Sequence, residues 1–199
     1  MNIAVLCSGN GTNLQAIIDA VRSGSIKATI ALVVSDNGDS YALERAKRAG
    51  ITVTHLDPRG YTSREAYDAE IVKRLRAKDV GLVVLAGFMR LLSPSFVKEY
   101  PGRIFNIHPA LLPSFKGTHG VRDALAYGVK VTGPTVHFVD EKLDHGPIVL
   151  QRAIEVRDGD TEETLTERMH KAEHEIYPQA IKLFVEGKLR IEGRRVVIT

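Results

Sequence analysis

The chain has 199 residues, of which 44% are hydrophobic, and it carries a net charge of +3 and a single cysteine. This length and composition fit one globular domain with a full core, and the single cysteine excludes an internal disulfide framework. The positive excess is small and dispersed, which favours small anionic ligands over nucleic acid. Because we find neither a membrane-spanning apolar run nor a secretory leader, we expect a soluble, cytoplasmic protein.

The first half of the sequence alternates between apolar runs and amphipathic stretches. Strands are predicted over residues 3–7, 28–35, 51–56, 82–86 and 104–107, with helices at 14–21, 42–49, 62–78 and after Ser93-Pro94. Thr62 and Glu65 have the spacing of a capping box that opens the third helix. Strand–helix alternation of this kind predicts a parallel, doubly wound sheet with right-handed crossovers.

The second half changes character. Residues 131–139 and 148–156 are predicted strands joined by a short loop, so we expect them to pair antiparallel. A long helix is predicted over residues 164–187, disturbed at Pro178, and residues 189–198 read as a hairpin that turns at Gly193. The predicted fold is α/β: one domain with a Rossmann-like, mostly parallel half over about 1–105. Antiparallel strands, a long helix and a terminal hairpin make up the other half, over about 106–199.

A glycine-containing loop, Ser8 to Asn13, joins the first strand to the first helix. Glycine lets the backbone approach a ligand closely, and the amides at a helix N-terminus face an anion with help from the helix dipole. We therefore predict that Gly11, Thr12 and Asn13 bind a phosphate monoester.

This loop has three other interpretations. A dinucleotide fingerprint needs a third glycine where Leu14 stands, although Asp36 lies where a ribose-binding acid could follow the second strand. A Walker loop needs a lysine that is missing here. A plain tight turn, with Thr12 or Asn13 as the helix N-cap, would need no ligand.

The strongest candidates for catalysis are Asn106, His108 and Asp144. Asn106 and His108 are two apart on a predicted strand, so their side chains project from the same face, and Pro109 stops the strand. An amide can donate to a developing oxyanion and an imidazole can carry a proton. The carboxylate of Asp144 would favour the imidazolium form.

The remaining chemically capable residues have simpler explanations. His170 and His174 have the i, i+4 spacing of a metal pair, but no third ligand is evident, so we expect a solvated helix face and no metal. His137 lies on an alternating strand and is expected to be structural. Cys7 lies within an apolar strand, which favours a buried thiol over a reactive one.

Six motifs occur together and in order along the chain. They are Gly9-Asn10-Gly11-Thr12-Asn13, Gly87-Phe88-Met89-Arg90-Leu91-Leu92, Asn106-Ile107-His108-Pro109, Leu111-Leu112-Pro113, Thr135-Val136-His137-Phe138-Val139 and Asp144-His145-Gly146-Pro147. With them the chain resembles the phosphoribosylglycinamide formyltransferases, from Met1 to about Gly187. This resemblance implies formyl transfer from 10-formyltetrahydrofolate, as a co-substrate, to the primary amine of glycinamide ribonucleotide in purine synthesis.

The resemblance also implies roles for individual residues. The phosphate cradle corresponds to Gly11, Thr12 and Asn13, and the catalytic trio to Asn106, His108 and Asp144. Contacts to the ribonucleotide correspond to Gly117, His170 and Glu173. Contacts to the folate correspond to Arg64, Met89, Arg90, Leu91, Leu92, Asn106, Asp140 and Asp144. Expected partners are these small molecules, with no metal, nucleic acid or membrane, for a monomer or homodimer.

Two other classes of function compete with this one. A methionyl-tRNA formyltransferase usually adds a C-terminal barrel, and a formyltetrahydrofolate hydrolase an N-terminal regulatory domain; neither is expected here. A nonenzymatic nucleotide-binding module would have the glycine loop without a polar trio, and Asn106, His108 and Asp144 argue against it.

Overall fold

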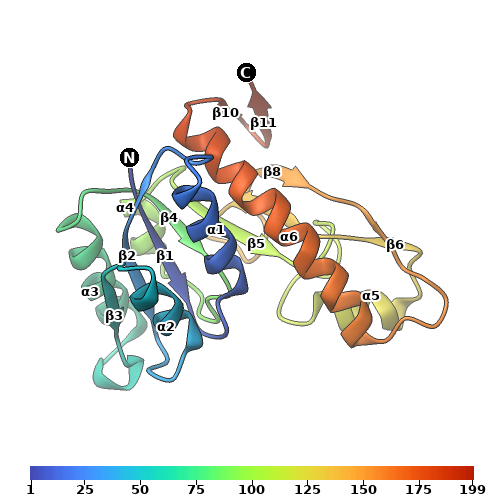
Figure 1. The fold of residues 1–199 in the computed structure, drawn as a ribbon, viewed down its shortest axis with the longest axis horizontal. Coiled ribbons are helices and arrows are strands. Elements are labelled where there is room, and N and C mark those ends of the chain that lie inside the picture. The colour runs from blue at the N-terminus through green and yellow to red at the C-terminus, as the bar shows by residue number, and fades with distance from the viewer. The chain divides into compact units, whose positions relative to one another are not determined.

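A computed structural model describes all 199 residues. The fold is α/β, with a mostly parallel sheet of seven strands (Figure 1). The chain divides into two compact units, Met1–Phe105 and Asn106–Thr199, which are described in turn as the first and the second unit. None of the helices has the length and apolar character needed to cross a membrane.

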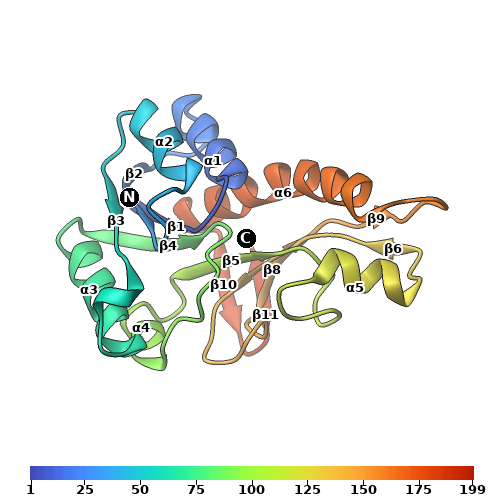
Figure 2. The same ribbon diagram turned by 90° about the horizontal axis from the view of Figure 1, so that it is seen from below.

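The first unit is doubly wound, as predicted. Its strands follow the order β3-β2-β1-β4-β5, and β1 pairs in parallel with both β2 and β4. Helices α1 and α2 cover one side of these strands and α3 and α4 cover the other (Figure 2). The elements are β1 (Asn2–Cys7), α1 (Thr12–Arg22), β2 (Thr29–Ser35), α2 (Tyr41–Arg48), β3 (Val53–His55), a short 3-10 turn (Pro58–Gly60), α3 (Arg64–Arg76), β4 (Val80–Leu85), α4 (Pro94–Glu99) and the start of β5 (Ile104–His108).

The core of this unit is built on β1 and β4. Every residue from Ile3 to Cys7 is fully buried, which is the burial expected of a central parallel strand covered on both faces. Burial, reinforced by the charge of Asp36, raises the pKa of the Cys7 thiol to about 12. A thiol with such a pKa is not a nucleophile at neutral pH, so Cys7 is a core residue, as expected.

The start of α3 differs from the prediction. Ser63, not Thr62, is the N-cap, and its hydroxyl accepts a hydrogen bond from the Ala66 amide at 3.1 Å. Glu65 then lies one position too early to reach back in a capping box. The predicted capping box is therefore wrong, although the helix is present.

The second unit combines antiparallel strands with a long helix. The strands follow the order β5-β7-β8, with β7 antiparallel to β8 and β6 antiparallel to β9. The long helix α6 packs along β7, β8 and β9 (Figure 1). The elements after β5 are α5 (Gly120–Tyr127), β6 (Val131–Thr132), β7 (Thr135–Phe138), β8 (Ile148–Gln151), β9 (Ile154–Glu155), α6 (Glu162–Val185), β10 (Leu189–Glu192) and β11 (Arg195–Ile198).

Four features of this unit depart from the sequence prediction, the first of which is that residues 148–156 form two strands, β8 and β9, where one was predicted. Residues 131–139 form two strands, because Gly133 has a φ of +151° and a Cβ there would lie 1.8 Å from the Arg152 carbonyl oxygen. Helix α6 runs through Pro178 without a break, since the buried residues around it hold the helix by packing. Helix α5 was not predicted, and it ends at Gly128 in the left-handed conformation.

Candidate active site

Strand β5 presents Asn106 and His108, and β7 brings His137 beside the first of them. The Asn106 Nδ2 atom lies 3.2 Å from His137 Nε2, and His137 Nδ1 lies 2.8 Å from the Phe138 carbonyl oxygen. A carbonyl only accepts, so the ring proton sits on Nδ1 and Nε2 accepts from the Asn106 amide. Burial lowers the pKa of His137 below its usual 6.5, which keeps this ring neutral.

His108 is nearly inaccessible and is engaged on both ring nitrogens. Its Nε2 lies 2.7 Å from the Phe115 carbonyl oxygen and its Nδ1 lies 3.5 Å from Asp144 Oδ2. The Phe115 carbonyl requires a proton on Nε2. Its Nδ1 atom faces the Asp144 carboxylate, which can only accept when ionised.

The carboxylate of Asp144 lies between the two histidines. Its Oδ2 atom accepts a hydrogen bond from the Gly117 amide at 2.9 Å, and its Oδ1 lies 3.8 Å from His137 Nε2. Asp144 has a φ of +45°, a left-handed conformation that aspartate tolerates better than most residues. The turn continues at Gly146, where a Cβ would lie 1.8 Å from the Phe138 carbonyl oxygen, so only glycine fits.

The segment after β5 is anchored by Thr135. The Thr135 hydroxyl donates to the Ala110 carbonyl at 2.7 Å and accepts from the Leu112 amide at 3.0 Å and from Gln151 Nε2 at 2.9 Å. The Leu112–Pro113 peptide is cis. From this anchor the chain carries the Phe115 carbonyl to His108 and the Gly117 amide to Asp144, so the segment contacts two members of the trio.

The glycine loop in the first unit is held by its carbonyl groups. The Gly9 carbonyl accepts from the Ser40 hydroxyl at 2.7 Å, and Arg45 donates to Asn10 through its backbone oxygen at 2.9 Å and its side chain at 2.8 Å. Gly11 is the N-cap of α1, with a φ of +77° and no side-chain cap. The alternative of a turn capped by Thr12 or Asn13 is therefore wrong.

The segment after β4 exposes apolar side chains. Met89 is 68% exposed and Leu91 is 56% exposed, whereas Leu92 is partly covered. The Met89 amide donates to the Ser8 hydroxyl at 3.0 Å, which ties this segment to the glycine loop. The Arg90 guanidinium lies 5.2 Å from the centre of the Tyr67 ring, and Arg64 at the start of α3 pairs loosely with Glu65 at 3.6 Å.

Beyond Asp144 itself, the loop of residues 140–146 is held by the Asp140 carboxylate. Asp140 Oδ1 accepts from the Lys142 amide at 2.9 Å and Oδ2 lies 2.7 Å from His145 Nδ1. Partial burial acts to raise the pKa of Asp140, but the hydrogen bonds from His145 and Lys142 outweigh it and the net shift is downward. We call residues 140–146 the Asp140 loop.

A family model described as formyl transferase matches residues 1–181. The chain belongs to the formyl transferase family. It is 49% identical over 191 residues to the phosphoribosylglycinamide formyltransferase of Escherichia coli (strain K12), which covers 96% of this chain and 90% of that protein.

Other relatives match this formyl transferase over most of its length. It is 48% identical over 187 residues to the trifunctional purine biosynthetic protein adenosine-3 of Drosophila melanogaster, covering 93% of this chain and 14% of that one. The crystal structure of glycinamide ribonucleotide transformylase 1 from Symbiobacterium toebii matches with a TM-score of 0.98 and 55% identity, over 100% of this chain and 93% of that chain.

The predicted ribonucleotide contacts of this formyl transferase have different surroundings. Gly117 uses its amide on Asp144, Glu173 is buried on α6, and His170 is exposed with its ring stacked on that of His174 at 6.2 Å. No group of three or more potential ligands that includes the pair His170 and His174 is placed to hold a metal.

Sequence reasoning missed His137 and Thr135 as parts of the site. Both are buried polar residues on β7, two positions apart, so they share a face of the strand as Asn106 and His108 do on β5. The available signal was the polar alternation of Thr135 and His137 within a strand whose other residues are apolar.

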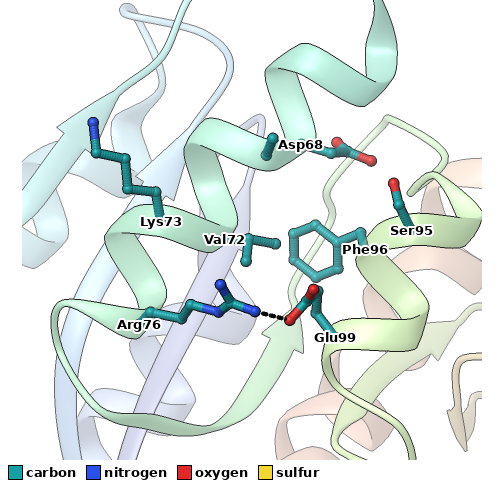
Figure 3. A pocket seen from close by; sticks show the side chains of 8 residues that line it. Asp68, Val72, Lys73, Arg76, Ser95, Phe96 and Glu99 are labelled. Carbon is teal, nitrogen blue, oxygen red and sulfur yellow. Dashed lines mark hydrogen bonds and ion pairs between the residues drawn. The ribbon is translucent and has the colours of Figure 1, made fainter.

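A surface pocket of about 340 Å³ lies between α3 and α4 and contains none of the predicted site residues (Figure 3). Val72 and Phe96 form its apolar wall, and the ion pair between Arg76 and Glu99 closes one end. Asp68, at the other end, accepts from the Ser93 amide at 2.6 Å.

Proposed function

We infer that the protein transfers the formyl group of 10-formyltetrahydrofolate to the primary amine of glycinamide ribonucleotide, in de novo purine synthesis. The observation that carries this conclusion is the grouping of Asn106, His108 and Asp144 in a chain that is 49% identical to a phosphoribosylglycinamide formyltransferase. An amide, an imidazole and a carboxylate supply what acyl transfer to an amine requires.

The first step is attack of the ribonucleotide amine on the formyl carbon. A carbon–nitrogen bond forms and the carbonyl oxygen becomes an oxyanion. Asn106 gives one amide hydrogen to His137 Nε2, which leaves the second for the oxyanion. One such donor stabilises the transition state by about 3 kcal/mol. His137 therefore orients the amide so that its nitrogen, not its oxygen, serves the reaction.

The second step breaks the bond between the formyl carbon and N10. The attacking amine loses one proton and the departing N10 gains one, so the exchange is balanced without an added acid. In the structure, the Nε2–H group of His108 donates a hydrogen bond to the Phe115 carbonyl. Once that carbonyl moves away, Nε2 donates its proton to N10. Asp144 stabilises the charged ring in transit. The products are the formylated ribonucleotide and tetrahydrofolate.

We further propose where each substrate binds. The amides of Gly11, Thr12 and Asn13 receive the phosphate, because they open α1 and the loop carbonyls are held by α2. We propose that Gly117, His170 and the buried Glu173 contact the ribonucleotide.

We propose that the folate binds at the segment Met89 to Leu92, because apolar side chains are exposed there. Met89 and Leu91 are among the large hydrophobic residues left exposed, as expected of a surface that takes a flat heterocycle. Arg64 suits a carboxylate of the folate tail, and Asp140 and Asp144 offer acceptors for its polar edge.

A single-turnover assay with both substrates tests this function. Transfer of one formyl group per enzyme to the ribonucleotide is the expected result. Release of free formate without transfer would instead indicate a formyltetrahydrofolate hydrolase. Transfer to methionyl-tRNA in place of the ribonucleotide would indicate the tRNA enzyme.

A further inference from the structure

The turn of the terminal hairpin contacts the Asp140 loop through one side chain. Glu192 of β10 pairs with Arg195 of β11, which leaves Gly193 and Arg194 in the turn. Arg194 Nη2 donates to the His145 carbonyl at 2.7 Å, and Arg194 Nη1 lies 3.2 Å from His145 Nε2. The guanidinium therefore contacts both the backbone carbonyl and the ring of His145.

The contacts of the His145 ring favour one tautomer. Nδ1 lies 2.7 Å from Asp140 Oδ2 and Nε2 faces Arg194, which can only donate. A neutral ring that donates from Nδ1 and accepts at Nε2 satisfies both neighbours. The chain of contacts runs from Arg194 through His145 to Asp140, and it joins the last residue before Gly146 to the first residue of the loop.

This chain of contacts joins the two ends of a segment whose middle residues are exposed. Glu141, Lys142 and Leu143 are exposed, and Asp144 has its strained φ of +45° directly before His145. The hairpin lies beyond residues 1–181, the part matched by the formyl transferase family model. The contacts between Arg194 and His145 thus involve a part of the chain that the family model does not include.

We propose that Arg194 is a positioning residue for formyl transfer: it holds the Asp140 loop through His145, and with it the carboxylate of Asp144. This inference rests on the proposed role of that loop in binding formyl-folate and in carrying Asp144. The terminal hairpin then helps to position the Asp140 loop for catalysis.

The test uses Arg194→Ala with Arg190→Ala as a matched control. Arg190 lies on the same hairpin, is exposed and pairs with Glu192 at 2.6 Å, with no contact to the loop in that pairing. The first readout is amide hydrogen exchange of residues 141–146 in the full-length protein without substrates. Loss of two charge-assisted hydrogen bonds should speed exchange about tenfold in Arg194→Ala and leave it unchanged in the control.

The second readout is the division of the kinetic effect. Arg194→Ala should raise the KM for formyl-folate and lower kcat, with the ribonucleotide KM unchanged, whereas simple destabilisation would lower kcat alone by reducing the active fraction. Arg194→Lys should restore little, because one ammonium cannot span the carbonyl and the ring as the guanidinium fork does. His145→Ala should add no further kinetic loss to Arg194→Ala, since the two act through one chain of contacts.

The outcomes separate this inference from the proposed function. If amide exchange of residues 141–146 is as slow in Arg194→Ala as in Arg190→Ala, Arg194 does not hold the loop. Faster exchange with unchanged kinetics would overturn the positioning role while formyl transfer stands. A wild-type protein without formyl transfer would refute the proposed function, and with it the catalytic part of this inference, whereas the exchange data would still report on whether Arg194 holds the loop.

Discussion

The glycine loop and the catalytic trio are built in opposite ways. The glycine loop, Ser8 to Asn13, is six consecutive residues that run from the end of β1 into the first turn of α1, and the groups it would offer to the phosphate are mainly backbone amides. The trio is made of side chains from β5 and the Asp140 loop, with His137 of β7 and the 115–117 segment against them. A backbone site needs only the local geometry of a strand–helix junction, whereas a side-chain site needs several distant segments in register.

This contrast predicts where mutations should interact. In the trio, neighbouring side chains act as a unit, so the losses of kcat caused by single substitutions should not multiply in a double mutant. In the glycine loop, one supporting contact should affect the binding of one substrate and leave the chemistry intact.

The largest effect is expected from His108→Asn. Removal of the proton carrier should lower kcat by about 10²- to 10⁴-fold, and Asp144→Asn should have a large effect because it leaves the imidazolium without its partner. If the two act together, the double mutant should be little worse than His108→Asn alone. The measurement is a double-mutant cycle on kcat, with binding of the ribonucleotide followed by calorimetry. Two full, multiplicative losses would show that Asp144 works independently of His108.

The next effect concerns His137, which the sequence alone presents as structural. Asn106→Ala should lower kcat by about 10²- to 10³-fold through loss of an oxyanion donor. His137→Asn removes the acceptor that orients the amide and should lower kcat by about tenfold, the value of one hydrogen bond to a developing charge. In the Asn106→Ala background, His137→Asn should cost nothing more. A further tenfold loss there would assign His137 a separate role.

In the glycine loop, Arg45→Met should raise the ribonucleotide KM by about fivefold, because two hydrogen bonds to Asn10 are lost and the loop becomes mobile. The KM for formyl-folate and kcat should stay near normal. The matched control is Arg48→Met, since Arg48 lies on the same helix and donates to Tyr41, not to the loop. Steady-state kinetics with each substrate varied in turn would decide. An equal change in both variants would contradict a role for Arg45 in the phosphate site.

The smallest effect is a pH dependence of stability from His137. Burial lowers its folded-state pKa below the usual 6.5, so the unfolded chain binds the proton more readily. Its contribution to stability is present above the unfolded pKa and is lost as the pH falls below it, with a slope of at most about 1.4 kcal/mol per pH unit. Denaturant unfolding between neutral and acidic pH should show a steeper decline for the wild type than for His137→Asn. Parallel curves would mean that His137 is not held neutral.

Local features of this protein could be predicted from its sequence. The alternation of apolar runs and amphipathic stretches predicted the doubly wound first unit, and the two-residue period placed Asn106 and His108 on one face of β5. The buried thiol of Cys7 and the hairpin turn at Gly193 were also predicted correctly. Each depends on a few neighbouring residues and on the geometry that those residues favour.

Other features were decided only by tertiary structure. The break at Gly133 and the unbroken helix at Pro178 depend on which contacts the folded chain offers. The same holds for the contacts of His137 with Asn106 and of Arg194 with His145, which join residues 31 and 49 positions apart. No periodic pattern links such positions, because the packing of distant segments fixes their distance and local backbone preference does not.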